Sequence, residues 1–262
     1  MEFVVTGERC YVYTGGQRFD PMLPVVVFVH GAANDHGVWA LQSRYLAWHG
    51  RAVLAVDLPG HGRSAGAPLP SIEALAEWTV ALLDAAGAGA ATLVGHSLGA
   101  LVALHAAAQH PARVRGVALL GPAVPMMVSD ALLGLAADDD PRALDLIVGW
   151  SYSAAAQLGG SPVPGMWLAG NALRLMQRMH PGVLSTDLLA CHRYEAGLAA
   201  AAGVRCPALL ILGSRDIMAP LRNAQALAAA LPQQQTVTLP GCGHALMAEE
   251  PEAVRKALVG FC

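Results

Sequence analysis

Short apolar runs separated by longer helical patterns dominate the chain, and this alternation constrains its fold more than any other feature. The runs are bounded by Gly, Pro or charged residues, and continuous apolar runs of this length are typical of strands buried on both faces of a parallel sheet. They lie at 25–29, 52–56, 92–94, 114–120 and 209–212. Helical patterns stand between and after them, at 41–49, 72–86, 98–109, 222–230 and 251–259. Repeated strand–helix–strand order predicts an α/β fold with a doubly wound, mostly parallel sheet and right-handed crossovers.

Two segments depart from this alternation. The first twenty residues are expected to be extended and hairpin-like, with Thr14-Gly15-Gly16 as the turn. From 123 to 202 no strand pattern is convincing, and methionine and tryptophan gather there. We therefore expect a core of residues 1–122 and 203–262 with an inserted helical cap at 123–202. The insertion could serve stability only. We favour a lid, because ligands bind at the carboxyl ends of such strands and Met and Trp form adaptable apolar surface.

A candidate nucleophile lies at the junction of a predicted strand and a predicted helix. Gly95-His96-Ser97-Leu98-Gly99 follows the strand pattern at 91–94 and precedes the helix pattern at 98–109. A G-x-S-x-G sequence in this context predicts a strained turn that exposes the serine hydroxyl above the sheet. A side chain at position 95 or 99 would collide with neighbouring backbone. Ser97 is therefore the candidate nucleophile, close to a helix N-terminus that favours negative charge.

A serine hydroxyl needs a base, and the base needs an orienting acid. Asp216 follows the strand pattern at 208–212, and His244 follows one at 236–239. Since the carboxyl ends of parallel strands meet at one edge of a sheet, the three side chains can converge, in the chain order Ser, Asp, His. Asp130 is a rival acid that follows the preceding strand, but it lies inside the predicted cap.

The chain also contains a candidate oxyanion hole. His30-Gly31-Ala32 ends the strand pattern at 25–29, so the backbone N–H of Ala32 can point where that of Leu98 points. We expect substrate contacts from His30, Gly31, His96 and Trp167.

Together these segments resemble the α/β-hydrolase superfamily. They occur in the family's order: HG at 30–31, DLPGHGRS at 57–64, GHSLG at 95–99, GSRD at 213–216 and GCGH at 241–244. The resemblance implies Ser97 as nucleophile, Asp216 as acid, His244 as base, and the Ala32 and Leu98 amides as oxyanion donors. It also implies that the loop at 57–64 is mainly structural.

The nucleophile separates this chain from several relatives within the superfamily. Haloalkane dehalogenases and epoxide hydrolases use an aspartate where this chain has Ser97, and dienelactone hydrolases use a cysteine. Proline iminopeptidases resemble the core but hold the substrate's amino group with acids of the lid. Asp187 and Glu195 could serve in that way here, although nothing in the sequence singles them out.

Two classes of function follow. The first is a serine hydrolase that cleaves a small, apolar carboxylic ester or thioester through an acyl-enzyme intermediate, with hydrolysis of a carbon–carbon bond in a diketone as an alternative for the same residues. The second is a ligand-binding or signalling protein that retains the fold and the triad. Multiple turnovers would distinguish an enzyme from a receptor. The substrate and the oligomeric state stay open, because fold analogy indicates chemistry and not substrate.

Composition argues against several other functions. Charged residues make up 13% of the chain, the formal net charge is −3 and Lys256 is the only lysine, so neither a nucleic-acid partner nor a polybasic membrane patch is expected. Mean hydropathy is high, at +0.44, but prolines and arginines interrupt every stretch long enough to span a membrane. The acidic second residue and the absence of a basic segment followed by an apolar run predict a cytoplasmic protein without a signal peptide.

Cysteine and histidine spacing predicts no cofactor. The five cysteines form no C-x-x-C pair, and the ten histidines form no H-E-x-x-H pattern. The sequence therefore predicts no metal, no disulfide framework and no organic cofactor, and a small-molecule substrate as the partner. Cys242, two residues before His244, is expected to pack beneath its loop.

Overall fold

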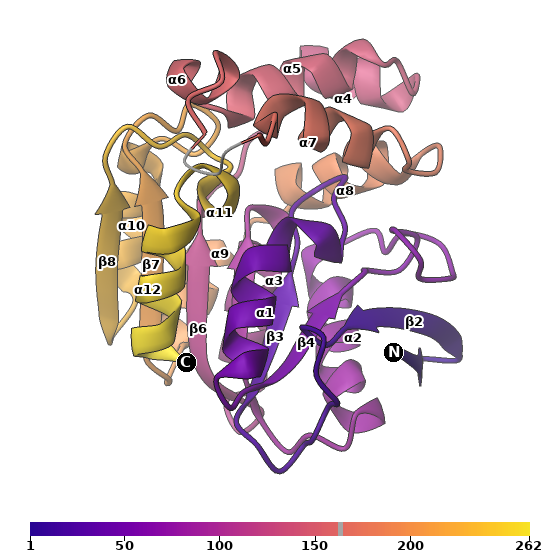
Figure 1. The fold of residues 1–262 in the computed structure, drawn as a ribbon, viewed down its shortest axis with the longest axis vertical. Coiled ribbons are helices and arrows are strands. Elements are labelled where there is room, and N and C mark those ends of the chain that lie inside the picture. Colours follow the sequence, from indigo (N-terminus) through magenta and orange to yellow (C-terminus); the bar gives the residue numbers. More distant parts are fainter. Residues whose placement is uncertain (162–164) are drawn as a thin grey trace.

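The computed structural model describes residues 1–161 and 165–262 and confirms the predicted α/β sheet (Figure 1). Within these residues one sheet of eight strands has the order β1-β2-β4-β3-β5-β6-β7-β8. β1 pairs with β2, and β2 with β4, in antiparallel fashion, whereas all pairs from β4 to β8 are parallel. The strands are β1 (Glu2–Val5), β2 (Glu8–Tyr13), β3 (Val25–Val29), β4 (Ala52–Val56), β5 (Ala91–His96), β6 (Val114–Leu120), β7 (Ala208–Gly213) and β8 (Gln234–Leu239).

Helices cover both faces of this sheet, as the continuous apolar strands require. In β3, Val25, Val27 and Val29 pack with α2 and α3, while Val26 and Phe28 pack with α1 and α12 on the opposite face. One face carries η1 (His36–Trp39), α1 (Ala40–Trp48), α11 (Leu246–Glu249) and α12 (Pro251–Phe261). The other carries α2 (Ile72–Ala85), α3 (Leu98–Gln109), α9 (Gly197–Gly203) and α10 (Leu221–Ala230).

Five further helices lie over the end of the sheet to which the arrowheads of β6 and β8 point (Figure 1). They are α4 (Asp130–Ala137), α5 (Arg142–Ser151), α6 (Ala154–Gln157), α7 (Leu168–Met176) and α8 (Val183–His192), and they share a third apolar cluster. The assignment of residues 123–202 as a cap stays a prediction. α9, at the end of that range, packs against the core helices α3 and α10.

The N-terminal hairpin is present, but the turn predicted for it is wrong. β1 and β2 are joined at Thr6 and Gly7, which have φ angles of 50° and 89°. Positive φ at both central residues is the requirement of a tight type I′ hairpin turn. Gly15, in the turn predicted instead, follows β2 and lies against α1, where an added Cβ would approach the Ser43 carbonyl oxygen to 2.6 Å. Position 15 therefore requires glycine because the chain passes close to α1, and not because of the hairpin.

The high mean hydropathy reflects buried helices. α3 is buried continuously from Leu98 to Ala107, between the sheet and the helices α2 and α9. Among the described residues no helix combines the length and the apolar character needed to cross a bilayer.

Candidate active site

Ser97 occupies a strained turn between β5 and α3. Its φ and ψ angles are 53° and −117°, a region that side-chain-bearing residues rarely adopt. Gly95 and Gly99 make this turn possible, because an added Cβ on Gly95 would overlap the Gly99 carbonyl oxygen and one on Gly99 would overlap the Val29 carbonyl oxygen. The collision predicted for positions 95 and 99 is thus confirmed. The turn leaves the Ser97 side chain partly exposed in a cavity at the end of the sheet.

Asp216 and His244 form a buried pair beside this turn. His244 Nδ1 lies 2.7 Å from Asp216 Oδ2, and Asp216 Oδ1 accepts the N–H groups of Met218 and Ala219 at 2.9 and 2.8 Å. Burial alone would raise the pKa of Asp216, but the His244 ring and these donors outweigh it and hold the pKa below its usual value. Asp216 is therefore a carboxylate. It accepts a proton-bearing Nδ1 and leaves Nε2 as the basic atom of His244.

His244 lines the same cavity as Ser97. Its Nε2 is buried and has no hydrogen-bond partner among the described residues. Serine–histidine hydrogen bonds commonly tighten only when substrate binds. The rival acid does not compete for His244, because Asp130 is exposed at the first turn of α4.

The main chain of His244 is held in place on two sides. His96 Nε2 donates to the His244 carbonyl oxygen at 2.9 Å. The Ser151 carbonyl oxygen, at the end of α5, accepts the N–H groups of His244 and Ala245 at 2.8 and 2.9 Å. Burial is the main cause that lowers the pKa of His96, to about 3, so its ring is neutral. His96 therefore lines the cavity and also positions the His244 loop.

Glu249 ties the same loop to the helices above the sheet, and the sequence reasoning missed it. Its carboxylate accepts the Gly243 N–H at 3.0 Å and the Ser153 N–H at 3.2 Å. Burial raises the pKa of Glu249 despite these hydrogen bonds. The only signal in the sequence is an acidic residue a few positions after His244, which is common on helix surfaces and points to no role.

Two backbone amides are available to an oxyanion. The N–H groups of Ala32 and Leu98 have no hydrogen-bond partner in the part of the chain that the structure describes. Leu98 is the first residue of α3, and Ala32 lines the cavity with Gly31 and Ser97. An added Cβ on Gly31 would lie 3.2 Å from the Ser97 Cβ, so the two loops approach closely. The two unpaired N–H groups therefore belong to loops that meet at Ser97.

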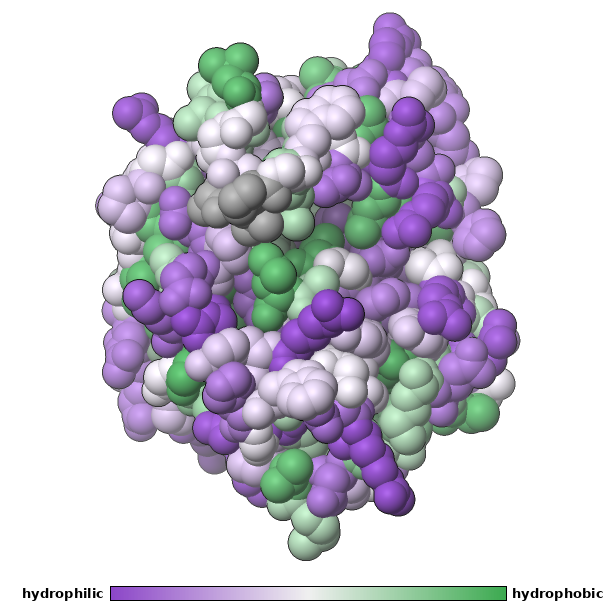
Figure 2. Space-filling model, viewed as in Figure 1, coloured by the Kyte–Doolittle hydropathy of each residue, from purple (hydrophilic) through white to green (hydrophobic). Residues whose placement is uncertain are grey.

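The cavity is large enough for a small ester. It has a volume of about 330 Å³, and its walls are mainly apolar, with side chains that include Met126, Leu132, Ile147, Trp150, Met176 and Leu188. A second apolar cavity of about 250 Å³ adjoins it and shares Asn34, His96, Ser151 and Met176. Figure 2 shows hydrophobic side chains gathered at the hollow between the overlying helices and the rest of the molecule.

The structure does not bring two of the expected contact residues into either cavity. His30 is fully buried; its Nδ1 donates to the Gly31 carbonyl oxygen at 2.8 Å, and its Nε2 accepts the Leu58 N–H at 3.2 Å. Burial, with a smaller contribution from His61, lowers the pKa of His30 to about 4. Trp167 is 68% exposed and lines neither cavity. Gly31 and His96, in contrast, line the cavity that contains Ser97.

The acids considered for binding an amino group lie elsewhere. Asp187 is buried, accepts the backbone N–H of Ala33 and lines neither cavity, and Glu195 is exposed. Neither of these two acids therefore lies where it could bind an amine in the cavities that the described residues form. Cys242 packs in the apolar cluster beside α12, as expected.

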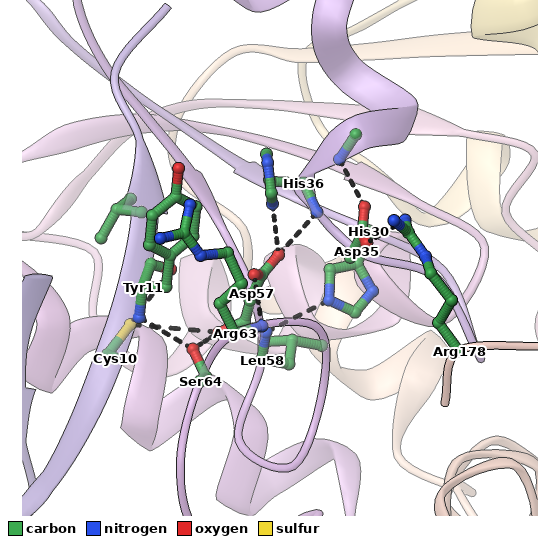
Figure 3. A network of polar contacts seen from close by, with 12 residues as sticks. Cys10, Tyr11, His30, Asp35, His36, Asp57, Leu58, Arg63, Ser64 and Arg178 are labelled. Atoms are coloured by element: carbon green, nitrogen blue, oxygen red, sulfur yellow. Dashed lines mark hydrogen bonds and ion pairs between the residues drawn. The ribbon is translucent and has the colours of Figure 1, made fainter. Parts of the chain in front are cut away.

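The loop at 57–64 is held by its own polar contacts (Figure 3). Asp57 Oδ1 accepts the backbone N–H of His36 at 2.8 Å and its Nδ1–H at 2.7 Å, and Oδ2 accepts the Arg63 N–H at 2.9 Å. Burial would raise the pKa of Asp57, but the hydrogen bonds from His36 outweigh it and hold the pKa low. Potential ligand atoms of Asp35, His36 and Asp57 lie within 4.8 Å of one another. Both oxygens of Asp57 are already engaged, so we assign this group to the structure of the loop.

Comparison with known proteins identifies the family. Residues 26–257 match the model of the alpha/beta hydrolase family. The chain is 33% identical to a pimeloyl-[acyl-carrier protein] methyl ester esterase of Chromobacterium violaceum over 243 residues, which are 88% of this chain and 92% of the relative. It is 34% identical to the enzyme of that name from Xanthomonas campestris pv. campestris over 254 residues, 91% of this chain and 94% of the relative.

A solved structure agrees at the level of the fold. The enol-lactonase from Burkholderia xenovorans LB400 superposes with a TM-score of 0.88 and 24% identity, covering 100% of this chain and 99% of that one. The chain belongs to the α/β hydrolase family. Within that family it is an ester-cleaving hydrolase, in line with its esterase relatives.

Proposed function

We propose that this protein hydrolyses a small, apolar carboxylic ester or thioester through an acyl-enzyme on Ser97. The observation that supports this most strongly is the buried His244–Asp216 pair, with its Nδ1–Oδ2 contact of 2.7 Å. Nε2 of this histidine has no hydrogen-bond partner among the described residues, and His244 and Ser97 line one cavity. A strained serine, an oriented imidazole and two free amide donors together meet the requirements of acyl transfer.

The reaction proceeds in two halves. His244 Nε2 takes the hydroxyl proton as Ser97 Oγ bonds to the carbonyl carbon, and the oxyanion accepts the N–H groups of Ala32 and Leu98. When the tetrahedral intermediate collapses, the bond to the alcohol or thiol breaks and that group leaves with the proton of His244. Water then attacks the acyl-enzyme, loses its proton to His244 and releases the acid. Ser97 recovers its proton in this step. Asp216 stabilises the imidazolium in both halves.

The lining of the cavities supports an uncharged substrate. Among the described residues no Asp, Glu, Lys or Arg lines either cavity, and an unpaired substrate charge would be costly in such surroundings. The acyl and alcohol portions would therefore be apolar or weakly polar. The methyl ester esterase name of the relatives supports a carboxylic ester with a small alcohol.

The cap belongs to the same proposal. Residues 123–202 would form it, over a core of residues 1–122 and 203–262. Side chains from α4, α5, α7 and α8 line the first cavity, which supports a role of this segment in substrate selection.

Labelling with a fluorophosphonate and peptide mapping tests the nucleophile, and turnover of p-nitrophenyl acetate and butyrate tests the activity. We expect one adduct, on Ser97, and many turnovers. Ser97→Ala should abolish labelling and lower kcat by several powers of ten without unfolding. Ser129→Ala is the matched control, because Ser129 lines the same cavity and should leave labelling intact.

Three results would refute the proposal. Labelling on another residue would remove Ser97 as the nucleophile, and near-normal turnover by Ser97→Ala would do the same. A single turnover with every ester would indicate a ligand receptor that retains the triad.

A further inference from the structure

Asp187 lies directly behind the loop that carries the proposed oxyanion donor. It belongs to α8, is 1% exposed, and its Oδ2 accepts the Ala33 N–H at 2.9 Å across 154 residues of sequence. Ala33 has a φ of 61°, a left-handed conformation that alanine adopts only where surrounding contacts impose it. The hydrogen bond to Asp187 is one such contact, and it acts on the residue next to the donor Ala32.

The peptide group between Ala32 and Ala33 is held at both of its polar atoms. Asn34 Nδ2 donates to the Ala32 carbonyl oxygen at 2.9 Å, and Asp187 accepts the N–H at the other end. With this group immobile, rotation about Ala32 is restricted on its C-terminal side. The direction of the Ala32 N–H, which the chemistry requires to be fixed before reaction, therefore depends on Asp187.

The charge of Asp187 is balanced on the side away from the loop. The same Oδ2 lies 2.8 Å from His61 Nε2, and His61 Nδ1 lies 3.0 Å from the Pro59 carbonyl oxygen. Both neighbours are acceptors, so both ring nitrogens donate and His61 is an imidazolium. Burial opposes this charge, but the carboxylate and the hydrogen bonds outweigh it and raise the pKa of His61.

This pairing matters for the reaction. A lone buried carboxylate behind the oxyanion loop would repel the negative charge that develops on the substrate oxygen. Paired with the His61 cation, it can anchor the loop and place no net negative charge there. His30, whose ring centroid is 4.9 Å from that of His61, is neutral, and its pKa is low.

We propose that Asp187 is a positioning residue that, balanced by His61, fixes the Ala32 amide for the oxyanion. The inference rests on the function proposed above. It assigns to an unremarkable acid of α8 a role in the rate of the reaction, and none in substrate binding.

The test replaces Asp187 by asparagine, which keeps the shape but loses the charge and one acceptor oxygen. Asp145→Asn, on the exposed side of α5, is the matched control. For p-nitrophenyl butyrate we expect kcat of Asp187→Asn to fall about ten- to a hundredfold, less than the loss of a whole oxyanion donor, with KM within threefold. Asp145→Asn should match the wild type.

Inhibitors provide a readout that general damage would not give. A trifluoromethyl ketone analogue of the butyrate ester forms a tetrahedral oxyanion on Ser97, whereas the corresponding methyl ketone reports on ground-state binding. In Asp187→Asn the inhibition constant of the trifluoromethyl ketone should rise by the same factor by which kcat/KM falls. The inhibition constant of the methyl ketone should stay constant. Equal weakening of both inhibitors, or an unchanged kcat, would overturn the inference.

A second variant tests the inference if Asp187→Asn does not fold. His61→Gln keeps one N–H donor for Asp187 but leaves its charge unbalanced, so kcat should fall and the trifluoromethyl ketone should bind more weakly. Unchanged values for both would overturn the inference. The wild type separates the two proposals: without a Ser97 adduct and turnover the proposed function fails, whereas normal turnover by Asp187→Asn refutes only the role of Asp187.

Discussion

Gly121→Ala tests whether the position of the His244 ring controls the rate. Gly121 follows β6 with a φ of 56°, and an added Cβ would lie 3.0 Å from both His244 Cε1 and Nδ1 and 3.5 Å from Asp216 Oδ2. Ordinary contact begins at 3.4 Å, so the ring must move by 0.4 Å. The substitution changes no charge and removes no hydrogen-bonding group. Its effect on kcat would therefore report on geometry.

The expected magnitude follows from this displacement. A misplacement of 1 Å can lower a rate about 100-fold. If the logarithm of the rate scales with distance, a shift of 0.4 Å lowers kcat roughly sixfold. The positive φ adds a cost of roughly 1–2 kcal/mol to the free energy of folding. Gly121→Ala should therefore be both less stable and slower.

Gly87→Ala separates these two effects. Gly87 has a φ of 68°, and an added Cβ would meet nothing within 4 Å. Urea unfolding should show a similar backbone cost in both variants, while p-nitrophenyl butyrate turnover should slow only in Gly121→Ala. Equal kcat values for the two variants would refute the reasoning, because the ring would then tolerate displacement or would not be the base.

Three further predictions concern the same region. Asp216→Asn should lower kcat by about 10⁴-fold in ester turnover, because the amide no longer stabilises the imidazolium; a loss below tenfold would contradict the assignment. Glu249→Gln should lower kcat about tenfold with little change in KM, whereas Glu250→Gln, at the partly exposed neighbouring position, should not; equal effects would contradict the role of Glu249 in the His244 loop. The pKa values of His30 and His96, about 4 and about 3, lie below the unfolded value near 6.5, so the unfolded chain binds these protons first. The free energy of unfolding should then fall as the pH is lowered from 6.5 to 4, by up to about 1.4 kcal/mol per pH unit for each ring. Urea unfolding that gives the same free energy throughout this range would contradict the prediction.

Local sequence pattern predicted the sheet because its central strands are short, mainly apolar runs. The predicted bounds of the runs at 25–29, 52–56 and 114–120 coincide with β3, β4 and β6. Such runs end at residues that cannot continue a buried strand, so their limits are encoded locally. The positions of Ser97, Asp216 and His244 follow from the same logic, since each comes just after the carboxyl end of a strand. Their spatial convergence is a consequence of parallel pairing.

The contacts that hold the reactive loops were not predictable in this way. Glu249 meets Ser153 across 96 residues, and Asp187 meets Ala33 across 154. Both acids lie in helices, where acidic residues usually face solvent. Their burial depends on how the helices pack against the rest of the molecule, which the local sequence does not encode. The prediction of the hairpin turn was wrong for a local reason. Thr6 adopts a positive φ, which a threonine in the sequence does not indicate.

Under the proposed function, the two buried carboxylates would affect the rate of the reaction more than the choice of substrate. Loops at strand ends are mobile unless they are anchored, and catalysis needs positions held within about 0.5 Å. Glu249 accepts the N–H of Gly243, in the loop that carries His244, and Asp187 accepts the N–H of Ala33, next to the proposed donor Ala32. Every residue except proline supplies such a backbone N–H group. Side chains such as Met126 and Leu132, which line the cavity and take no part in these hydrogen bonds, can then change without moving either anchor. Substitutions there should therefore alter KM and the order of preferred esters, whereas substitutions at the anchors should alter kcat.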